Sequence, residues 1–196
     1  MTNTNISRKS KFIKGQTLAV MLVNLTIGAV AGIKYSDLEP RHQTVISKEA
    51  NLDICFTPSS SGCATLITKE IASANSSIYI QAYGFTSASI ANEIVKAKER
   101  GVKVFVILDK SNLSGKYSKI KLLKQSGIDV RIDTVPGIAH NKVMIIDDNK
   151  VITGSFNFTE AADKSNAENV VIIQNNDVAK IYFDNWQKRY SRSREA

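Results

Sequence analysis

The feature that most restricts the fold is a near-continuous apolar run, VKVFVIL, at residues 102–108. Short runs of this kind, rich in β-branched residues, are typical of strands that are buried on both faces of a sheet. A segment of helical spacing ends just before the run, at Gly101, and glycine is a common helix stop. The run therefore predicts a sheet that is covered by helices on both faces.

The alternation of strands and helices continues along the chain. Strand patterns are found at residues 53–56, 77–83, 102–108, 129–132, 143–146, 151–153 and 169–173. Helical spacing is found at residues 64–74, 87–100, 116–125 and 177–189. Residues 147–150 have the composition of a hairpin turn between two of the strands. We predict a single α/β domain over residues 51–196, in which a mixed β-sheet is flanked by helices on both faces.

The first 31 residues have a different character. Residues 1–16 contain four basic residues and no acidic one, and residues 17–32 carry no charge. This stretch ends with the small residues Ala29 and Ala31, which have the spacing of a cleavage site. This order is typical of a secretory signal peptide. A membrane anchor is one alternative, although the apolar stretch is shorter than the ~20 residues of a usual span. A first helix of the domain is the other.

Residues 32–50 form a polar connector, in which His42 is expected to be solvated and to have no role. We therefore expect an exported protein, periplasmic or secreted, or one that residues 17–32 tether to the inner membrane.

Cleavage of the first 31 residues also changes the net charge. The whole chain has a net charge of +8, but four of its 26 basic residues and none of its 18 acidic ones precede residue 32, which leaves +4. The positive charge of the remaining domain is modest.

The two cysteines, Cys55 and Cys63, flank the turn-rich sequence FTPSSSG. In an exported protein such a pair favours a small-loop disulfide. Two unpaired thiols on neighbouring elements are the alternative. A zinc site would need two further ligands at a suitable spacing, so we expect no metal here.

One segment, IAHNKVMIIDDNKVITGSFNF at residues 138–158, carries the candidate chemistry. His140 and Lys142 lie two residues apart, so on an extended chain their side chains point to the same face. The hairpin brings Ser155 and Asn157 back beside them, and Gly154 allows a phosphate or backbone to approach closely. The resulting patch holds an imidazole, an ammonium, a hydroxyl and an amide.

This combination suits phosphoryl transfer. A histidine can act as nucleophile or general base, and cationic and neutral donors stabilise charge on phosphoryl oxygens. Glu168, an isolated acid before an apolar strand, is a candidate for orienting the imidazole. Each residue taken singly has an ordinary structural explanation, such as a solvated histidine, an edge-strand lysine or a turn. Their combined spacing favours the functional one.

The segment resembles the HxKx4Dx6GSxN motif of the phospholipase D superfamily. The residues that match it without departure are His140, Lys142, Asp147, Gly154, Ser155 and Asn157. The likeness extends over about residues 50–190, where CFTPSSSGCATLI and IYIQAYGFTSASIANEIVKAKERGVKVFVILDKSN are similar to the small bacterial endonucleases of the Nuc type.

The resemblance implies a mechanism without metal or cofactor. His140 would attack the phosphodiester and form a covalent phosphohistidine, which water then hydrolyses. Lys142, Ser155 and Asn157 would bind the phosphate, and Glu168 would orient the histidine. Asp147 belongs to the motif, but we expect it to be structural, at the turn of the hairpin.

Partners and substrate also follow from the resemblance. A second motif supplies the acid for the leaving group, and this sequence has only one motif, so a homodimer is expected with the site on its two-fold axis. Nucleic acid, DNA or RNA, is the expected substrate. A phospholipid substrate and a non-enzymatic binding module are the alternatives. A lysine cluster either flanks the cleft or is a solvated helix face; its members are Lys110, Lys116, Lys119, Lys121 and Lys124.

Overall fold

The computed structural model describes residues 50–58 and 62–196, which belong to one compact unit. Within this part the strands form one eight-stranded sheet in the order β1-β7-β6-β5-β2-β3-β4-β8. Their bounds are β1 Asn51–Thr57, β2 Ser77–Ala82, β3 Lys103–Leu108, β4 Asp129–Ile132, β5 Lys142–Ile146, β6 Lys150–Gly154, β7 Glu168–Gln174 and β8 Arg194–Glu195. The β2–β3 and β3–β4 pairs are parallel and the other pairs are antiparallel. The prediction of a mixed sheet is confirmed.

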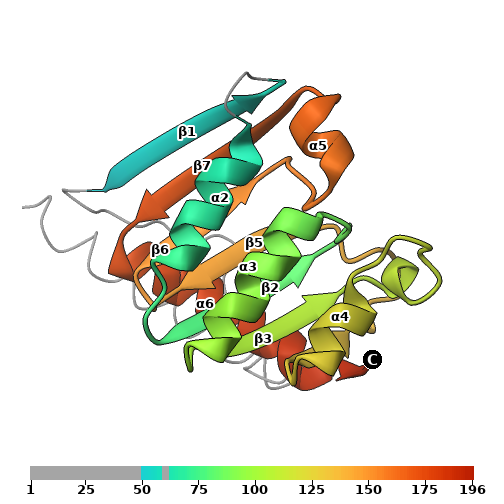
Figure 1. The fold of residues 1–196 in the computed structure, drawn as a ribbon. Helices are drawn as coiled ribbons and strands as arrows, with labels where there is room; N and C mark the ends of the chain where they lie inside the picture. The colour runs from blue at the N-terminus through green and yellow to red at the C-terminus, as the bar shows by residue number, and fades with distance from the viewer. Residues whose placement is uncertain (1–49, 59–61) are drawn as a thin grey trace, which may run out of the picture. The chain divides into compact units, whose positions relative to one another are not determined.

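Helices cover both faces of this sheet, as predicted. Figure 1 shows α2, α3 and α4 in front of it and α6 behind it. The bounds are α2 Cys63–Ala72, α3 Ala88–Glu99, the 3-10 helix η2 Lys110–Leu113, α4 Ile120–Gln125, α5 Glu160–Lys164 and α6 Asn176–Arg192. None of the helices in the described part combines the length and apolar character that a membrane crossing requires.

Alternation along the strands divides the core between the two faces. On β5, Met144 packs in the cluster that includes α2 and α3, whereas Ile145 packs in the cluster that includes α6. Successive side chains of a strand point to opposite faces, so a strand that is apolar at every position is buried on both. On the α6 face Trp186 also donates a hydrogen bond from its indole nitrogen to the backbone oxygen of Ile80, at 2.9 Å. This bond ties α6 to the central strand β2.

The helix expected at residues 116–125 begins only at Ile120. The preceding residues form η2 and a loop instead. Asp109 caps η2 by accepting a hydrogen bond from the backbone N–H of Ser111, and the Lys119 N–H pairs with the Phe85 oxygen across the loop. These tertiary hydrogen bonds compete with helical ones. The short elements α5 and β8 were not predicted either.

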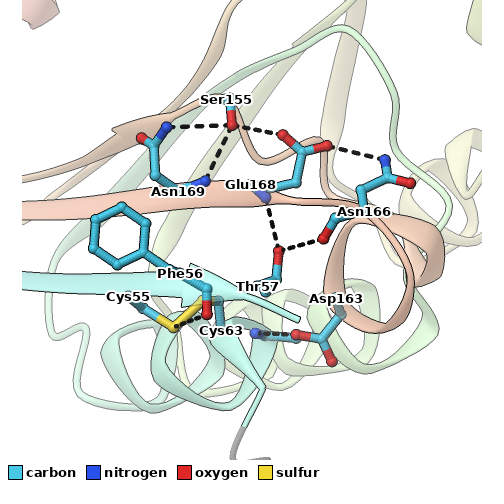
Figure 2. Close-up of a disulfide and its surroundings, with 10 residues drawn as sticks. Cys55, Phe56, Thr57, Cys63, Ser155, Asp163, Asn166, Glu168 and Asn169 are labelled. Atoms are coloured by element: carbon cyan, nitrogen blue, oxygen red, sulfur yellow. Dashed lines mark hydrogen bonds between the residues drawn. A yellow bond between two sulfur atoms is a disulfide. The ribbon is translucent and has the colours of Figure 1, made fainter. Parts of the chain in front are cut away.

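The structure pairs Cys55 of β1 with Cys63 of α2 in a disulfide (Figure 2). Next to it the Thr57 hydroxyl accepts a hydrogen bond from the Glu168 N–H and donates one to the Asn166 oxygen, at 3.1 and 3.0 Å. The end of β1 is therefore fixed to α2 on one side and to the start of β7 on the other. The predicted signal peptide or anchor, the connector up to residue 49 and His42 lie outside the described residues.

Candidate active site

The residues of the motif, except Asp147, gather at one edge of the sheet. This edge carries the carboxyl ends of the parallel strands β2 and β3 together with the start of β5, the end of β6 and the start of β7. His140 directly precedes β5 and Lys142 begins it, opposite Ala82. Ser155 follows the last residue of β6. Ligand sites of α/β sheets form at the carboxyl ends of their parallel strands.

Lys142 is a buried lysine, with only 6% of its surface exposed. Its Nζ donates to the backbone oxygen of His140 at 2.7 Å and lies 5.2 Å from the centre of the Tyr83 ring. Burial lowers the pKa of Lys142, and the nearby negative charge of Glu168 offsets part of this effect. An ammonium in such surroundings is stabilised by further negative charge.

His140, in contrast, is exposed. Its ring lies against Tyr83, with ring centres 4.6 Å apart. Among the described residues, no hydrogen bond to the imidazole nitrogens is found. Both nitrogens are therefore open to a substrate or to a second protein chain.

The Gly154-Ser155 pair shows why the motif needs a glycine. Gly154 has a φ of +145°, and a Cβ atom at this position would lie 2.2 Å from the backbone oxygen of Asn169. The chain can therefore pass this close to β7 only without a side chain. The Ser155 hydroxyl next to it donates to Glu168 at 2.5 Å and accepts from the Asn169 N–H at 3.1 Å (Figure 2).

Glu168 is a charged carboxylate at this edge. Hydrogen bonds from Ser155 and then from Asn166 lower its pKa, burial acts in the opposite direction, and the charge of Lys142 lowers the pKa further. Within the described chain its hydrogen bonds run to Ser155 and Asn166, and none joins it to the His140 ring. Its orienting role therefore stays a prediction.

Asn157 has a side-chain oxygen, Oδ1, that is buried without a hydrogen-bond partner among the described residues. Gly84 faces it closely, because a Cβ on Gly84 would come within 3.6 Å of the Asn157 side chain. A buried amide without a partner is unusual and often belongs to a functional group. The unpartnered oxygen is an acceptor, so an anionic ligand would be bound by the amide nitrogen of the same side chain.

Sequence reasoning missed the residues that hold the His140 loop. The buried Asp109 accepts hydrogen bonds from the backbone N–H groups of Ala139 and Ser111, at 2.7 and 2.9 Å. Burial acts to raise the pKa of Asp109, but these hydrogen bonds outweigh it and the pKa is lowered. The Tyr83 N–H also donates to the Asn141 oxygen at 2.9 Å. A carboxylate directly after a buried strand, as in Leu108-Asp109, was the available signal.

Asp147 is not part of this gathering. It follows β5 at the end opposite His140, in the turn to β6, with a φ of +51°. Its carboxylate accepts hydrogen bonds from the N–H groups of Asn75, Ser76 and Ser77 and from the Ser76 hydroxyl, at 2.8–3.2 Å. The carboxylate therefore fixes the start of β2 to the hairpin.

Asp147→Asn is expected to lower the free energy of unfolding by about 1–2 kcal/mol at pH 7, because a charged acceptor of four donors is lost. Burial acts to raise the pKa of Asp147, but the hydrogen bonds from residues 75–77 lower it overall. A lowered pKa contributes stability that is present above about pH 4 and is lost as the pH falls. Urea denaturation at pH 7 and pH 3 measures the difference, which should shrink at pH 3.

Asp148→Asn is the matched control for this prediction. Asp148 also has a positive φ, +56°, and is exposed. Its replacement should leave the free energy of unfolding unchanged within about 0.5 kcal/mol. Equal losses in the two variants, or a loss of turnover by the folded Asp147→Asn protein as large as that expected for a reacting group, would contradict a purely structural role.

The lysine cluster divides in the structure. Lys110 lies in η2 and donates to the Pro136 oxygen of the His140 loop at 3.2 Å, and Lys116 lies 5.4 Å from the ring centre of the exposed Tyr117. Lys124, on α4, instead hydrogen-bonds the carboxyl-terminal residue Ala196. Of these three lysines, Lys110 contacts the His140 loop and Lys124 contacts the carboxyl-terminal residue.

Taken together, the site can bind an anionic group and attack it. Lys142 supplies an ammonium and His140 an open imidazole, and the Ser155 hydroxyl lies at the same edge with its proton directed to Glu168. In residues 50–58 and 62–196, no three His, Cys, Asp or Glu side chains are arranged so that they could hold a metal ion.

Known proteins are similar to this chain in sequence and in fold. A family model described as "Cardiolipin synthase, PLD-like domain" matches residues 67–189. A protein named phospholipase D from Rickettsia typhi is 51% identical over 154 residues, which cover 78% of this chain and 75% of that protein.

Two solved structures are also similar. Nuc from Salmonella typhimurium, described as a phospholipase D family member, is 36% identical with a TM-score of 0.71, covering 76% of this chain and 99% of that one. NucT from Helicobacter pylori is 27% identical with a TM-score of 0.71, covering 76% of this chain and 100% of that one. With the site geometry, the family match and these identities, the chain belongs to the phospholipase D superfamily of phosphodiesterases.

Proposed function

We propose that this chain is an endonuclease, which hydrolyses phosphodiester bonds of nucleic acid without a metal ion, through a phosphohistidine. The observation that carries the proposal is that an exposed His140 ring, the buried Lys142 ammonium and the Ser155 hydroxyl all lie at the same edge of the sheet. These groups stand at the strand ends, and Lys110 donates a hydrogen bond to the loop that carries His140. Contacts of this kind recognise the phosphate backbone and not the base sequence.

In the first step an imidazole nitrogen of His140 attacks the phosphorus atom, and the bond from phosphorus to the leaving oxygen breaks. Lys142 and Asn157 stabilise the negative charge on the phosphoryl oxygens. An acid donates a proton to the leaving oxygen, so that an alcohol departs. In the second step water attacks the phosphohistidine, which releases a phosphomonoester and restores the free imidazole.

The acid of the first step must come from elsewhere. The sequence contains two histidines, and the second, His42, lies in the polar connector and outside any HxK pattern. We propose that His140 of a second copy of the chain donates the proton, across the two-fold axis of a homodimer. The exposure of His140 in the single chain supports this arrangement.

A dimeric site predicts that specific activity depends on protein concentration. On dilution below the dimer dissociation constant, turnover per chain should fall in proportion to the remaining dimer. Analytical ultracentrifugation and activity assays over one dilution series check this. A monomer that keeps the full turnover would contradict the shared site.

A phospholipid substrate is the second candidate. The Rickettsia relatives are named phospholipase D, and the description of the matching family model names cardiolipin synthase. The two candidates share the same phosphodiester chemistry at His140. They differ in what flanks the phosphate, so only a direct comparison of substrates separates them.

The test uses the full-length chain and its His140→Ala variant, each with excess chelator. The substrates are plasmid DNA, RNA and vesicles that contain phosphatidylcholine and cardiolipin. Cleavage of DNA or RNA by the wild type alone supports the proposed nuclease. Release of a lipid headgroup with intact nucleic acid would instead assign the lipid reaction, and a strict need for a divalent metal ion would overturn the proposed mechanism.

We also propose that the domain works outside the cytoplasm. The Cys55–Cys63 disulfide supports this, because disulfides persist in oxidising compartments and are rare in the cytosol. The signal peptide or anchor predicted in residues 1–31 agrees with it. Alkylation of free thiols in protein taken directly from cells tests the proposal, since two reactive cysteines would contradict it.

A further inference from the structure

An exposed apolar ridge runs along the edge strand β1 toward the candidate site. Its members are Leu52, Ile54 and Phe56, which are 56%, 57% and 67% exposed. They alternate along the strand, so all three lie on one face of the sheet. Edge strands usually carry charged side chains that discourage association, so large apolar groups here call for an explanation.

Phe56 differs from the other two members because of its neighbour. It lies opposite Asn169 of β7 in the strand register, whereas Leu52 and Ile54 lie opposite Ile173 and Val171. Asn169 in turn holds the Ser155 hydroxyl, through its N–H at 3.1 Å and its side-chain amide at 3.4 Å. Asn169 alone thus lies between the exposed Phe56 ring and the Ser155 hydroxyl of the candidate phosphate site.

Figure 2 shows this arrangement, with the Phe56 ring between the β1 and β7 ribbons and the Asn169 side chain reaching toward Ser155. The ring lies two strands away from β6, or about 10 Å at the usual strand spacing. A sugar and base attached to a phosphate at Ser155 can span such a distance. Phe56 and Glu168 point to opposite faces of the sheet. A nucleic-acid strand that crosses the strand ends can therefore place its phosphate at this edge and its base on the face that carries the ridge.

We infer that Phe56 is a stacking surface for an unpaired base next to the scissile phosphate. The inference rests on the proposed nuclease function and names the form of its substrate. Aromatic side chains stack on any base, because every base has a flat π-face. A base inside a duplex has both faces covered by its neighbours, so the contact requires a single-stranded or locally unstacked substrate. Ile54 and Leu52 lack a π-system and lie farther from the phosphate site.

The experiment compares diesters that share the same leaving group. Thymidine 5′-(p-nitrophenyl phosphate) and thymidine 3′-(p-nitrophenyl phosphate) carry a base on either side of the phosphate, and methyl p-nitrophenyl phosphate carries none. For the full-length chain we measure kcat/KM on each and take the ratio of base-bearing to base-free substrate. Phe56→Ala should lower this ratio about 5- to 150-fold for at least one thymidine isomer, the range that corresponds to the loss of one stacked base.

Two variants make the test specific. Leu52→Ala removes a side chain of similar exposure from the same face of β1 and should leave the ratio unchanged. Phe56→Trp keeps an aromatic surface and should retain or raise the ratio. Because all three substrates react at the same phosphate site, a general loss of folding or dimerisation lowers every rate and leaves the ratio as it was.

The possible failures can be told apart. If the wild type hydrolyses all three diesters and Phe56→Ala keeps its ratio, the inference fails and the proposed function stands. If Leu52→Ala lowers the ratio as much as Phe56→Ala does, the effect belongs to the apolar ridge as a whole and not to the Phe56 ring, and the stacking role is overturned. If the wild type hydrolyses none of the diesters, the proposed function fails and the inference fails with it.

Discussion

His140→Ala is expected to lower kcat for phosphodiester hydrolysis by at least about 10⁴-fold, because it removes the only imidazole at the described site. The variant should fold normally. His140 is exposed, and its ring makes one aromatic contact, with Tyr83. The melting temperature should therefore change by no more than a few degrees. Lost activity with unchanged stability is the combination that a nucleophile predicts.

The measurement combines steady-state kinetics with chemical trapping. A ³²P-labelled oligonucleotide is mixed with excess enzyme and stopped in alkali, in which phosphohistidine is stable. Wild-type protein should retain the label and His140→Ala should not. Asn141→Ala is the matched control, because this exposed neighbour contributes its backbone oxygen to the loop contact with Tyr83. Labelled protein in the His140→Ala variant would identify another residue as the nucleophile.

The central part of the fold could be predicted because its sequence pattern has one simple physical reading. In β3 and β5 most side chains are buried, so each strand appears as an apolar run after its first lysine. In α3 the buried residues include Ile90, Ile94 and Ala97, at helical spacing. Ser87 caps this helix by accepting a hydrogen bond from the Ile90 N–H. Burial pattern and local signals agree in these elements, so the sequence alone was sufficient.

Short elements escaped prediction because contacts distant in sequence decide them. In α5, the cap at Thr159 is local, but the Asp163 carboxylate binds the Ala64 N–H at the start of α2. The two-residue strand β8 exists only because it pairs with Arg131 and Ile132 of β4. The helix expected from residue 116 begins late for the same reason, since Lys119 pairs with Phe85. Helical spacing alone carries no information on such pairings.

The candidate site, too, was predicted only in part. The two-residue spacing and the hairpin correctly predicted that Lys142 and Ser155 lie at one edge of the sheet, because strand geometry is regular. Tyr83 and Asp109 were missed, although both hold the His140 loop. They follow β2 and β3, and a strand pattern does not state which strands will be neighbours. The order β5-β2-β3 of the sheet is what brings these residues together.

The second large effect is expected at Lys142. Lys142→Met keeps a long unbranched side chain and removes the ammonium, so kcat/KM should fall by about 10²–10³-fold through lost charge stabilisation. The same change should raise the free energy of unfolding at pH 7 by on the order of 1 kcal/mol, since replacing a buried charge by a packed apolar group is often stabilising. Kinetics and urea denaturation on one preparation test both effects.

The direction of the stability change follows from the pKa. Burial lowers the pKa of Lys142 in the folded protein, so the unfolded chain binds this proton more tightly. The charged group therefore opposes folding at pH 7, and this penalty shrinks as the pH rises through the lowered pKa of the folded protein and is gone above about 10.4, the ordinary lysine value. The advantage of Lys142→Met should vanish over the same range. Wild-type activity should decline with an apparent pKa below that value, and the residual activity of Lys142→Met should lack this decline. A variant less stable than wild type at pH 7 would show that the ammonium holds the edge together through the His140 oxygen and Glu168, and not mainly by binding substrate.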